Sequence, residues 1–206
     1  MNQLDLQSFW ELLPLKGLGP IHFLMEKSDI QPYDKILGKI IAEENENLEQ
    51  RRRDFQDTAK QFSEFFSEED LKIALDALEE TIGNDRDDVS TTFMDSGISM
   101  EFKTDRLVEF FADDRAKLLH FKGMPIFSSE PFRLISEISK ELNEIPLMKD
   151  EEVVFPNHHF FLFSFLTEQA TGQYREGPKK NRSVSWRDSP RTHAVDLADY
   201  QPLKFF

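Results

Sequence analysis

Two kinds of hydrophobic periodicity meet near residue 88 of this chain. Beyond that point Ile98, Met100 and Phe102 alternate with serine, glutamate and lysine, which is typical of a half-buried strand. Before it, apolar residues recur at helical spacing. We therefore predict an α+β protein with a helical N-terminal half and an antiparallel β-meander sheet with a packed helix in the C-terminal half. We divide the chain into a helical region, 1–88, and an antiparallel sheet region, 89–206, which we expect to form one compact unit.

The pattern of the C-terminal half predicts strands separated by polar turns. Segments 98–103, 107–111 and 118–121 predict a three-stranded meander, because the polar stretches between them have hairpin length. An amphipathic helix is expected to begin near Pro131. The apolar run His158–Leu166 predicts a central strand that is covered on both faces. Segment 182–187 predicts an edge strand.

The N-terminal half contains one long stretch without proline, from Tyr33 to about Phe66, with Gly38 as its only glycine. Its apolar stripe is thin and predicts a long helix, or two helices in line, partly exposed or completed by another chain. The residues that define the stripe fall seven apart: Ile41, Leu48, Phe55 and Phe62. A further helix is expected from Leu71 to Ile82, ended by Gly83. A dimer formed through the long helix is compatible with this pattern, and the oligomeric state stays open.

The chain is strongly acidic, with 39 Asp and Glu against 25 Lys and Arg and a formal net charge of −14. Binding a nucleic acid requires a basic surface, so we expect no nucleic-acid partner. The charge instead favours either solubility alone or a basic protein partner. The sequence has no cysteine, no signal-peptide pattern and no apolar run long enough to span a bilayer, so we expect a cytoplasmic protein without a membrane partner.

Few residues suggest catalytic chemistry. Asp113 and Asp114 with Glu109 could hold Mg²⁺, although solvated acids in a turn explain the same pattern. His158 and His159 are adjacent in a predicted strand and would point to opposite faces, so they cannot share a metal unless the strand contains a bulge. We therefore predict that the chain is not an enzyme and has no metal or cofactor. Two alternatives stay open: a metal-dependent hydrolase that uses Asp113 and Asp114, and a structural protein that self-associates through the long helix.

One region of the sequence resembles a known family. It comprises Gly97-Ile-Ser-Met-Glu-Phe, Arg106-Leu-Val-Glu-Phe-Phe and Phe121-Lys-Gly-Met-Pro-Ile-Phe127, followed by a helix. This pattern, over about residues 90–145, resembles bacterial immunity-type proteins of polymorphic toxin systems of the contact-dependent, Rhs or type VI kind. The resemblance implies a non-catalytic cytoplasmic inhibitor that binds a cognate toxin and occludes its active site.

The acidic residues of the predicted meander are the candidates for contact with such a toxin. They occupy polar strand positions and turn tips, where side chains reach solvent and can meet basic residues of a partner. The predicted partner-binding residues are Glu101, Asp105, Glu109, Asp113 and Asp114.

Overall fold

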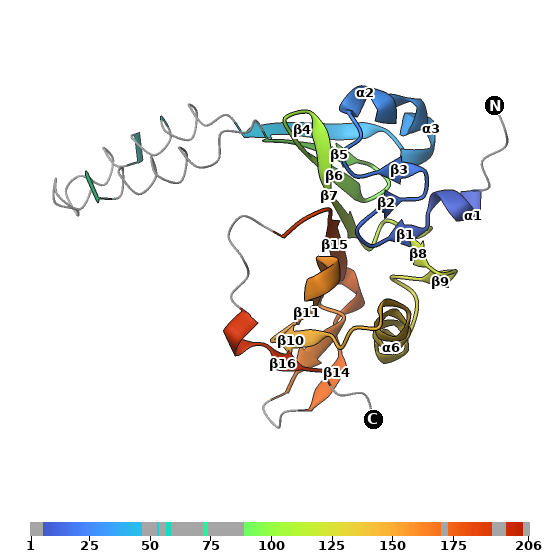
Figure 1. Cartoon of the computed structure of the whole chain (residues 1–206), viewed down its shortest axis with the longest axis vertical. Coiled ribbons are helices and arrows are strands. Elements are labelled where there is room, and N and C mark those ends of the chain that lie inside the picture. Colours follow the sequence, from blue (N-terminus) through green and yellow to red (C-terminus); the bar gives the residue numbers. More distant parts are fainter. Residues whose placement is uncertain are drawn as a thin grey trace.

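The computed structural model describes residues 6–46, 53, 57–58, 72–73, 89–169, 173–190 and 197–203. Its main feature is a nine-stranded antiparallel sheet with the order β16-β10-β11-β12-β15-β7-β6-β5-β4, which runs from the bottom to the top of Figure 1. The strands are β4 (Ile40–Glu46), β5 (Val89–Met94), β6 (Ile98–Lys103), β7 (Arg106–Asp113), β10 (Leu147–Lys149), β11 (Glu152–Phe155), β12 (Phe160–Phe163), β15 (Ser183–Arg187) and β16 (Gln201–Pro202).

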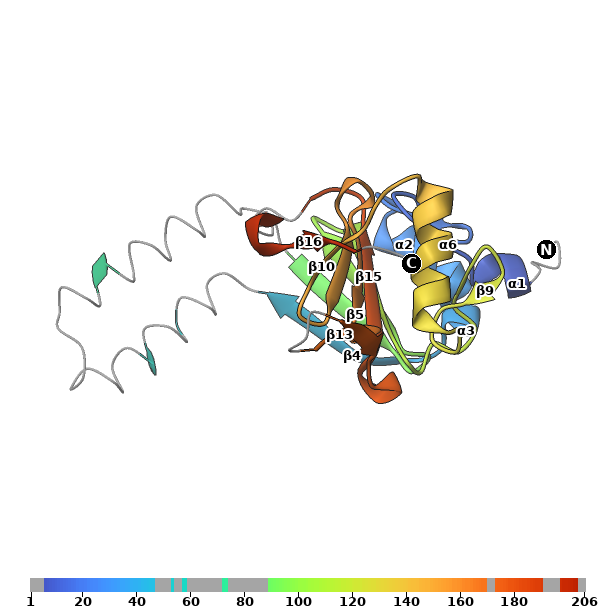
Figure 2. The same cartoon turned by 90° about the horizontal axis from the view of Figure 1, so that it is seen from below.

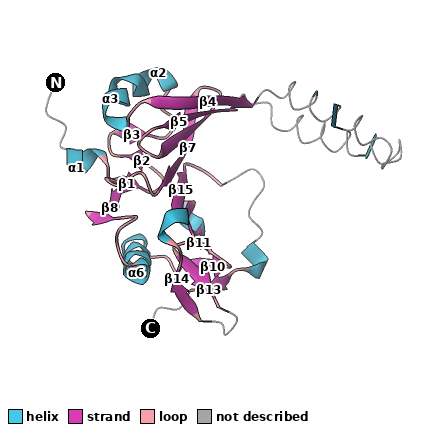
Figure 3. Ribbon diagram, turned by 180° about the vertical axis from the view of Figure 1, so that it is seen from behind, coloured by secondary structure: helices cyan, strands magenta, loops and turns pink. Residues whose placement is uncertain are grey.

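Smaller elements surround this sheet (Figure 3). A three-stranded sheet is formed by β1 (Leu12–Leu13), β2 (Gly17–Leu18) and β3 (Ile21–His22). Two short hairpins are β8 (His120–Phe121) with β9 (Met124–Pro125), and β13 (Leu166–Glu168) with β14 (Tyr174–Glu176). The described helices are α1 (Leu6–Phe9), α2 (Lys27–Ile30), α3 (Asp34–Leu37) and α6 (Pro131–Leu142), with short 3-10 turns η1 (Gln31–Tyr33), η2 (Pro156–His158), η3 (Lys179–Asn181) and η4 (Leu197–Asp199). None of the described helices is long and apolar enough to cross a membrane.

The predicted fold class is wrong, because residues 6–46 contain only short helices between strands and a large sheet dominates the part of the chain that the structure describes. The helix expected from Tyr33 ends at Leu37, and the chain continues as strand β4. Gly38 explains the break, since its φ of 109° lies outside the helical range and a Cβ there would meet the Asp95 carboxylate at 2.1 Å. That carboxylate accepts a hydrogen bond from the Lys39 amide at 2.8 Å, which fixes the turn into the strand.

The rest of the expected long helix, and the helix expected over 71–82, lie outside the described residues apart from positions 53, 57–58 and 72–73. Strand β4 comes before position 88, where we placed the regional boundary, and pairs with β5, which comes after it. The large sheet is therefore built from both sides of that position.

The alternating pattern located β6 and β7 correctly, and their hairpin turns through Thr104 and Asp105, which have φ of 50° and 63°. Positive φ at both central residues matches the turn that suits the right-handed twist of paired strands. The third predicted meander strand is wrong, because β8 pairs with β9 and not with the large sheet. The edge position predicted for 182–187 is also wrong: β15 lies between β12 and β7.

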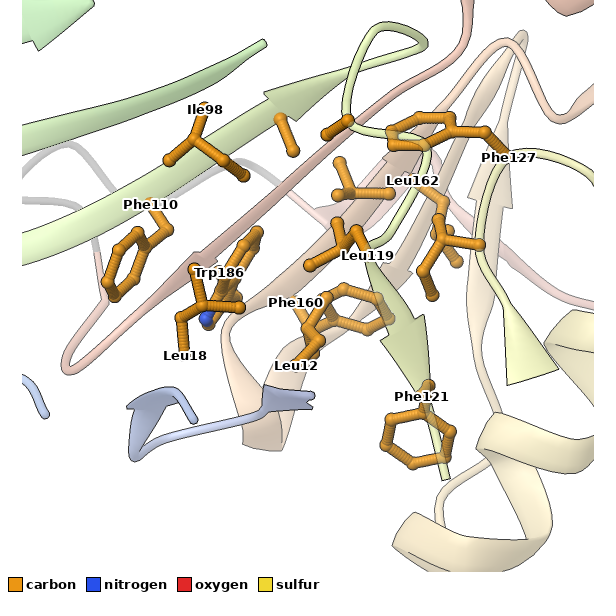
Figure 4. Close-up of a cluster of buried hydrophobic side chains, with 14 of the residues drawn as sticks. Leu12, Leu18, Ile98, Phe110, Leu119, Phe121, Phe127, Phe160, Leu162 and Trp186 are labelled. Carbon is orange, nitrogen blue, oxygen red and sulfur yellow. The ribbon is translucent and has the colours of Figure 1, made fainter. Parts of the chain in front are cut away.

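The main core lies on one face of the large sheet. Trp186 of β15 stacks on Phe110 of β7 with ring centroids 5.0 Å apart, and both side chains are fully buried. The Trp186 indole N–H donates to the carbonyl of Gly17 at 2.8 Å, which ties the small N-terminal sheet to the centre of the large one. Figure 4 shows Trp186 beside Leu18 of the small sheet. A buried aromatic pair of this kind contributes about 0.5–1.5 kcal/mol beyond the apolar area that it buries.

Helix α6 packs into the same core through Leu134, Ile135 and Ile138 (Figure 2). Its first turn is capped by Glu130, whose carboxylate accepts hydrogen bonds from two backbone amides, at 3.0 Å and 2.7 Å. The helix ends at Leu142, and the C-cap residue Asn143 has a left-handed conformation in which its backbone N–H donates to carbonyls of the last turn. Local capping therefore sets both ends of this helix.

The opposite face of the sheet, here called the outer face, is covered at only one end by described residues. Tyr200, which follows η4, packs on Val154 and Phe161, and Leu197 borders the same cluster. This cluster covers β10, β11 and β12. The outer face of β5, β6 and β7 carries no described cluster of this kind.

Candidate functional site

A row of side chains crosses the outer face at right angles to the strands. The pairing register places Phe93 opposite Ser99, Ser99 opposite Phe111, Phe111 opposite Ser185, and Ser185 opposite Phe161. Aromatic and small residues therefore alternate from strand to strand. Because neighbouring strands lie about 4.8 Å apart, successive phenylalanines of this row start about 10 Å apart. A flat group or a methylene chain fits between rings at that spacing.

The gap between Phe93 and Phe111 forms an open groove of about 320 Å³, here called the aromatic slot. Phe111 keeps 37% of its surface exposed, although it belongs to a strand that is otherwise mostly buried. The slot is lined by Thr91, Phe93, Ser99, Glu101, Glu109 and Phe111. Phe93 and Phe111 form its apolar walls, Thr91 and Ser99 contribute hydroxyl groups, and Glu101 and Glu109 form an acidic end.

The acidic end is built by the next row of the sheet. Glu109 is only 6% exposed and accepts hydrogen bonds from the Ser185 hydroxyl and from Nη1 of Arg187. The second terminal nitrogen of Arg187, Nη2, lies 3.5 Å from Oε1 of Glu101. Arg187 is drawn to this position because β15 places it directly opposite Glu109.

Three charged groups meet at this end of the slot: Glu101, Glu109 and Arg187. Two carboxylates share one guanidinium, so the row retains one formal negative charge among these three groups. Glu109 is buried, whereas the Glu101 side chain is 32% exposed. Glu101 is consequently the group that an incoming cation would reach first.

The structure brings only two of the predicted binding residues together. Glu101 and Glu109 are directly opposite each other across β6 and β7. Asp105 is at the tip of the hairpin, where its backbone carbonyl accepts from the Lys27 amide at 3.2 Å. Asp113 and Asp114 are at the other end of β7. The five residues therefore form no single surface.

Asp113 is held by Arg115 of its own turn. Its carboxylate accepts from the backbone amide of Arg115 at 2.9 Å and from the guanidinium at 2.7–3.1 Å. Burial alone raises the pKa of Asp113, but the hydrogen bonds and charge of Arg115 outweigh it and hold the pKa below its usual range. Asp114 lies 4.0 Å from the ammonium of Lys117. The carboxylates suggested for Mg²⁺ are thus engaged by basic side chains.

The two adjacent histidines have separate environments. Nδ1 of His158 lies 2.6 Å from Oε2 of Glu144, and Oε1 of the same carboxylate accepts from the Asn157 amide at 2.8 Å. His159 has a left-handed backbone conformation, and burial lowers the pKa of its ring. Within the described ranges, no group of three or more His, Asp or Glu is arranged to hold a metal ion.

A second hollow, of about 400 Å³, lies by the β10–β11 turn near Tyr200. Two of its three acidic residues are hydrogen-bonded within the protein: Glu151 accepts from Ser164 at 2.6 Å, and Glu152 accepts from the Tyr200 hydroxyl at 2.7 Å. Burial and this carboxylate raise the pKa of Tyr200 well above its usual range. The aromatic slot is therefore the better candidate for binding, because it presents the exposed ring of Phe111 and the half-buried ring of Phe93 beside its carboxylates.

Sequence reasoning did not identify the slot walls or Arg187. One signal was available for Phe111, since adjacent strand residues point to opposite faces and Phe110 already fills the core position. No comparable local signal marks Arg187, because its contact with Glu109 depends on how distant strands pair.

Comparisons with known proteins add no family assignment. The chain is not significantly similar to any protein-family model, any curated protein or any solved structure.

Proposed function

We propose that this chain is a non-catalytic inhibitor that binds a basic partner protein through the outer face of its sheet. The observation that carries this proposal is the aromatic slot, which has phenylalanine walls and an acidic end. The formal net charge of −14 supports a basic partner, because complementary charge accelerates association and disfavours wrong partners.

The slot suits a lysine or arginine side chain. The methylene stem would lie between Phe93 and Phe111, and the charged head would reach Glu101. A cation beside an aromatic face contributes about 0.5–2 kcal/mol. A hydrogen bond to a charged group adds about 1.5–3 kcal/mol. Two or three such residues are enough to dominate the affinity of a complex.

The immunity-type resemblance of about residues 90–145 gives this binding activity a biological role. We propose that the partner is a toxin encoded beside this chain and that binding occludes its active site in the cytoplasm. Toxins that act on nucleic acids or nucleotides hold phosphates with lysine and arginine. An acidic, aromatic slot is complementary to such a surface.

The test begins with the toxic C-terminal domain of a large secreted protein encoded by the adjacent reading frame. Co-expression with the wild-type chain should restore growth, and calorimetry on the purified pair should measure the affinity. Glu101→Lys and Phe111→Ala should each weaken binding by on the order of 10-fold or more, equivalent to about 1.4 kcal/mol. Glu141→Lys, on the exposed side of α6, makes the same charge change away from the slot and should leave the affinity unchanged.

Two results would reject the proposal. One is the absence of any such neighbour or a failure of the wild-type chain to bind it. The other is wild-type affinity in both slot variants, which would place the interface elsewhere.

A further inference from the structure

The two edges of the large sheet are built differently. At one edge β16 has only two residues and includes Pro202, which has no N–H to offer an additional strand. At the other edge β4 has seven residues. Short strands and prolines are the usual means of preventing unwanted pairing at a sheet edge. Only the β16 edge is protected in that way.

Strand β4 is exposed over the part whose burial the structure describes. Residues 39–45 are all exposed, including Ile40 at 48% and Ile41 at 56%. Its one partner in the large sheet is β5, so the backbone groups that point away from β5 have no strand neighbour among the described residues. An open row of N–H and C=O groups is the template to which an extended peptide adds as a further strand.

The charges of β4 indicate which kind of strand could pair with its free edge. The strand reads Ile-Ile-Ala-Glu-Glu-Asn-Glu and contains no basic residue. A second copy would bring the same acidic residues to this edge, and like charges across a strand pair are destabilising. A strand that carries lysine or arginine would instead form favourable cross-strand pairs. Lys27 illustrates this preference inside the protein, since its ammonium lies 2.9 Å from Glu43 and lowers the pKa of that carboxyl.

Glu44 is the charge best placed to select the incoming strand. It is exposed, and its register partner is Thr91, a residue that lines the aromatic slot. Since Cα partners in paired strands point to the same face, Glu44 extends the acidic surface of the slot to the edge of the sheet. An added strand would therefore meet negative charge on the outer face.

We propose that the free edge of β4 is a docking site for an extended, basic segment of a partner protein, which pairs with it as an additional strand. This inference does not depend on the aromatic slot or on the identity of the partner as a toxin. It rests on the unequal protection of the two edges, the exposure of β4 and its acidic sequence.

The probe is an acetylated and amidated nine-residue peptide that alternates lysine with threonine. It is added to the full-length ¹⁵N-labelled chain, and amide exchange is followed by NMR. Every second amide of β4 should exchange at least about 10-fold more slowly with the peptide bound, because those N–H groups then donate to the new strand. Amides of β16 should not change.

Two control peptides separate strand pairing from simple charge attraction. The first keeps every lysine but has two central threonines replaced by proline, so it retains the charge and cannot complete the ladder. The second has glutamate in place of lysine. Neither should protect β4. Equal protection by the proline peptide, or no protection by the basic peptide, would overturn the inference.

A matched pair of variants tests the role of charge. Glu44→Lys should reduce affinity for the basic peptide at least about 5-fold and improve that for the glutamate peptide, whereas Glu141→Lys should do neither. Both residues are exposed, so an unchanged amide spectrum outside the mutated site will verify the fold. Protection of alternate β4 amides without peptide, together with a dimer in sedimentation, would overturn the inference in favour of a second copy.

Discussion

The buried pair between Glu109 and Arg187 gives the sharpest test of the structure, because it requires no partner. Glu109→Gln preserves the shape of the side chain and removes its charge. The Arg187 side chain is only 14% exposed and would lose its main counter-charge. It would keep Glu101, whose carboxylate lies 3.5 Å away.

The expected loss in the free energy of unfolding follows from these contacts. Removing one partner of a fully buried ion pair destabilises a protein by about 3–5 kcal/mol. The remaining contact with Glu101 and the partial exposure of Arg187 reduce this figure, so we expect about 2–3 kcal/mol for Glu109→Gln. In a protein of this size the change lowers Tm by about 4–12 °C.

Urea unfolding followed by tryptophan fluorescence will measure the change, since Trp10 and Trp186 are both buried. Asp113→Asn is the matched control on the same strand. It removes a carboxylate from a solvent-exposed pair with Arg115, and such pairs contribute about 0–1 kcal/mol.

Combining Glu109→Gln with Arg187→Gln should restore part of the loss, because no buried charge then lacks a partner. We expect a coupling energy of at least about 1 kcal/mol between the two positions. The reasoning is refuted if the two single losses simply add, or if Glu109→Gln costs no more than Asp113→Asn.

Three further predictions concern stability. Burial holds the pKa of His159 below its usual 6.5, so just below pH 6.5 the folded state binds fewer protons than the unfolded state. The free energy of unfolding should therefore fall as pH drops from about 6.5 toward the lowered pKa. His159→Asn, which tolerates the left-handed backbone, should flatten this pH profile in unfolding titrations. Gly17→Ala should cost more than the about 1–3 kcal/mol of a strained φ, because the new Cβ would lie 2.0 Å from the Ile21 carbonyl, and an unchanged unfolding midpoint in urea would contradict this. Glu130→Ala should cost about 1 kcal/mol in the same assay through loss of the α6 cap, whereas an unchanged midpoint would mean that water replaces the carboxylate.

The elements that sequence reasoning located are those fixed by local signals. Strands β6 and β7 have clear alternation and a short hairpin connection, and α6 has a proline in its first turn. The prediction of a helix from Tyr33 was wrong because it gave more weight to the seven-residue apolar repeat than to Gly38 and the β-branched Ile40 and Ile41, which favour a break and a strand. Pairing with β5 then fixed the segment as a strand, which no local pattern reveals.

The candidate site was only partly predictable for the same reason. The Glu101–Glu109 pair follows from one hairpin, so a correct register suffices to place the two residues together. Arg187 reaches Glu109 only because β15 inserts next to β7, far from it in sequence. The aromatic slot likewise requires the order of strands across the sheet as well as the face on which each residue lies.

The pairing of β4 with β5 also has an evolutionary consequence. Glu46 is directly opposite Val89, so the chain leaves the sheet and returns to it at neighbouring points. The sheet therefore imposes little constraint on the length of the connection between Glu46 and Val89, because the entropy cost of joining two nearby ends rises only slowly with the number of residues between them. This position is a natural insertion point, at which segments can be gained, exchanged or lost while the same scaffold is retained.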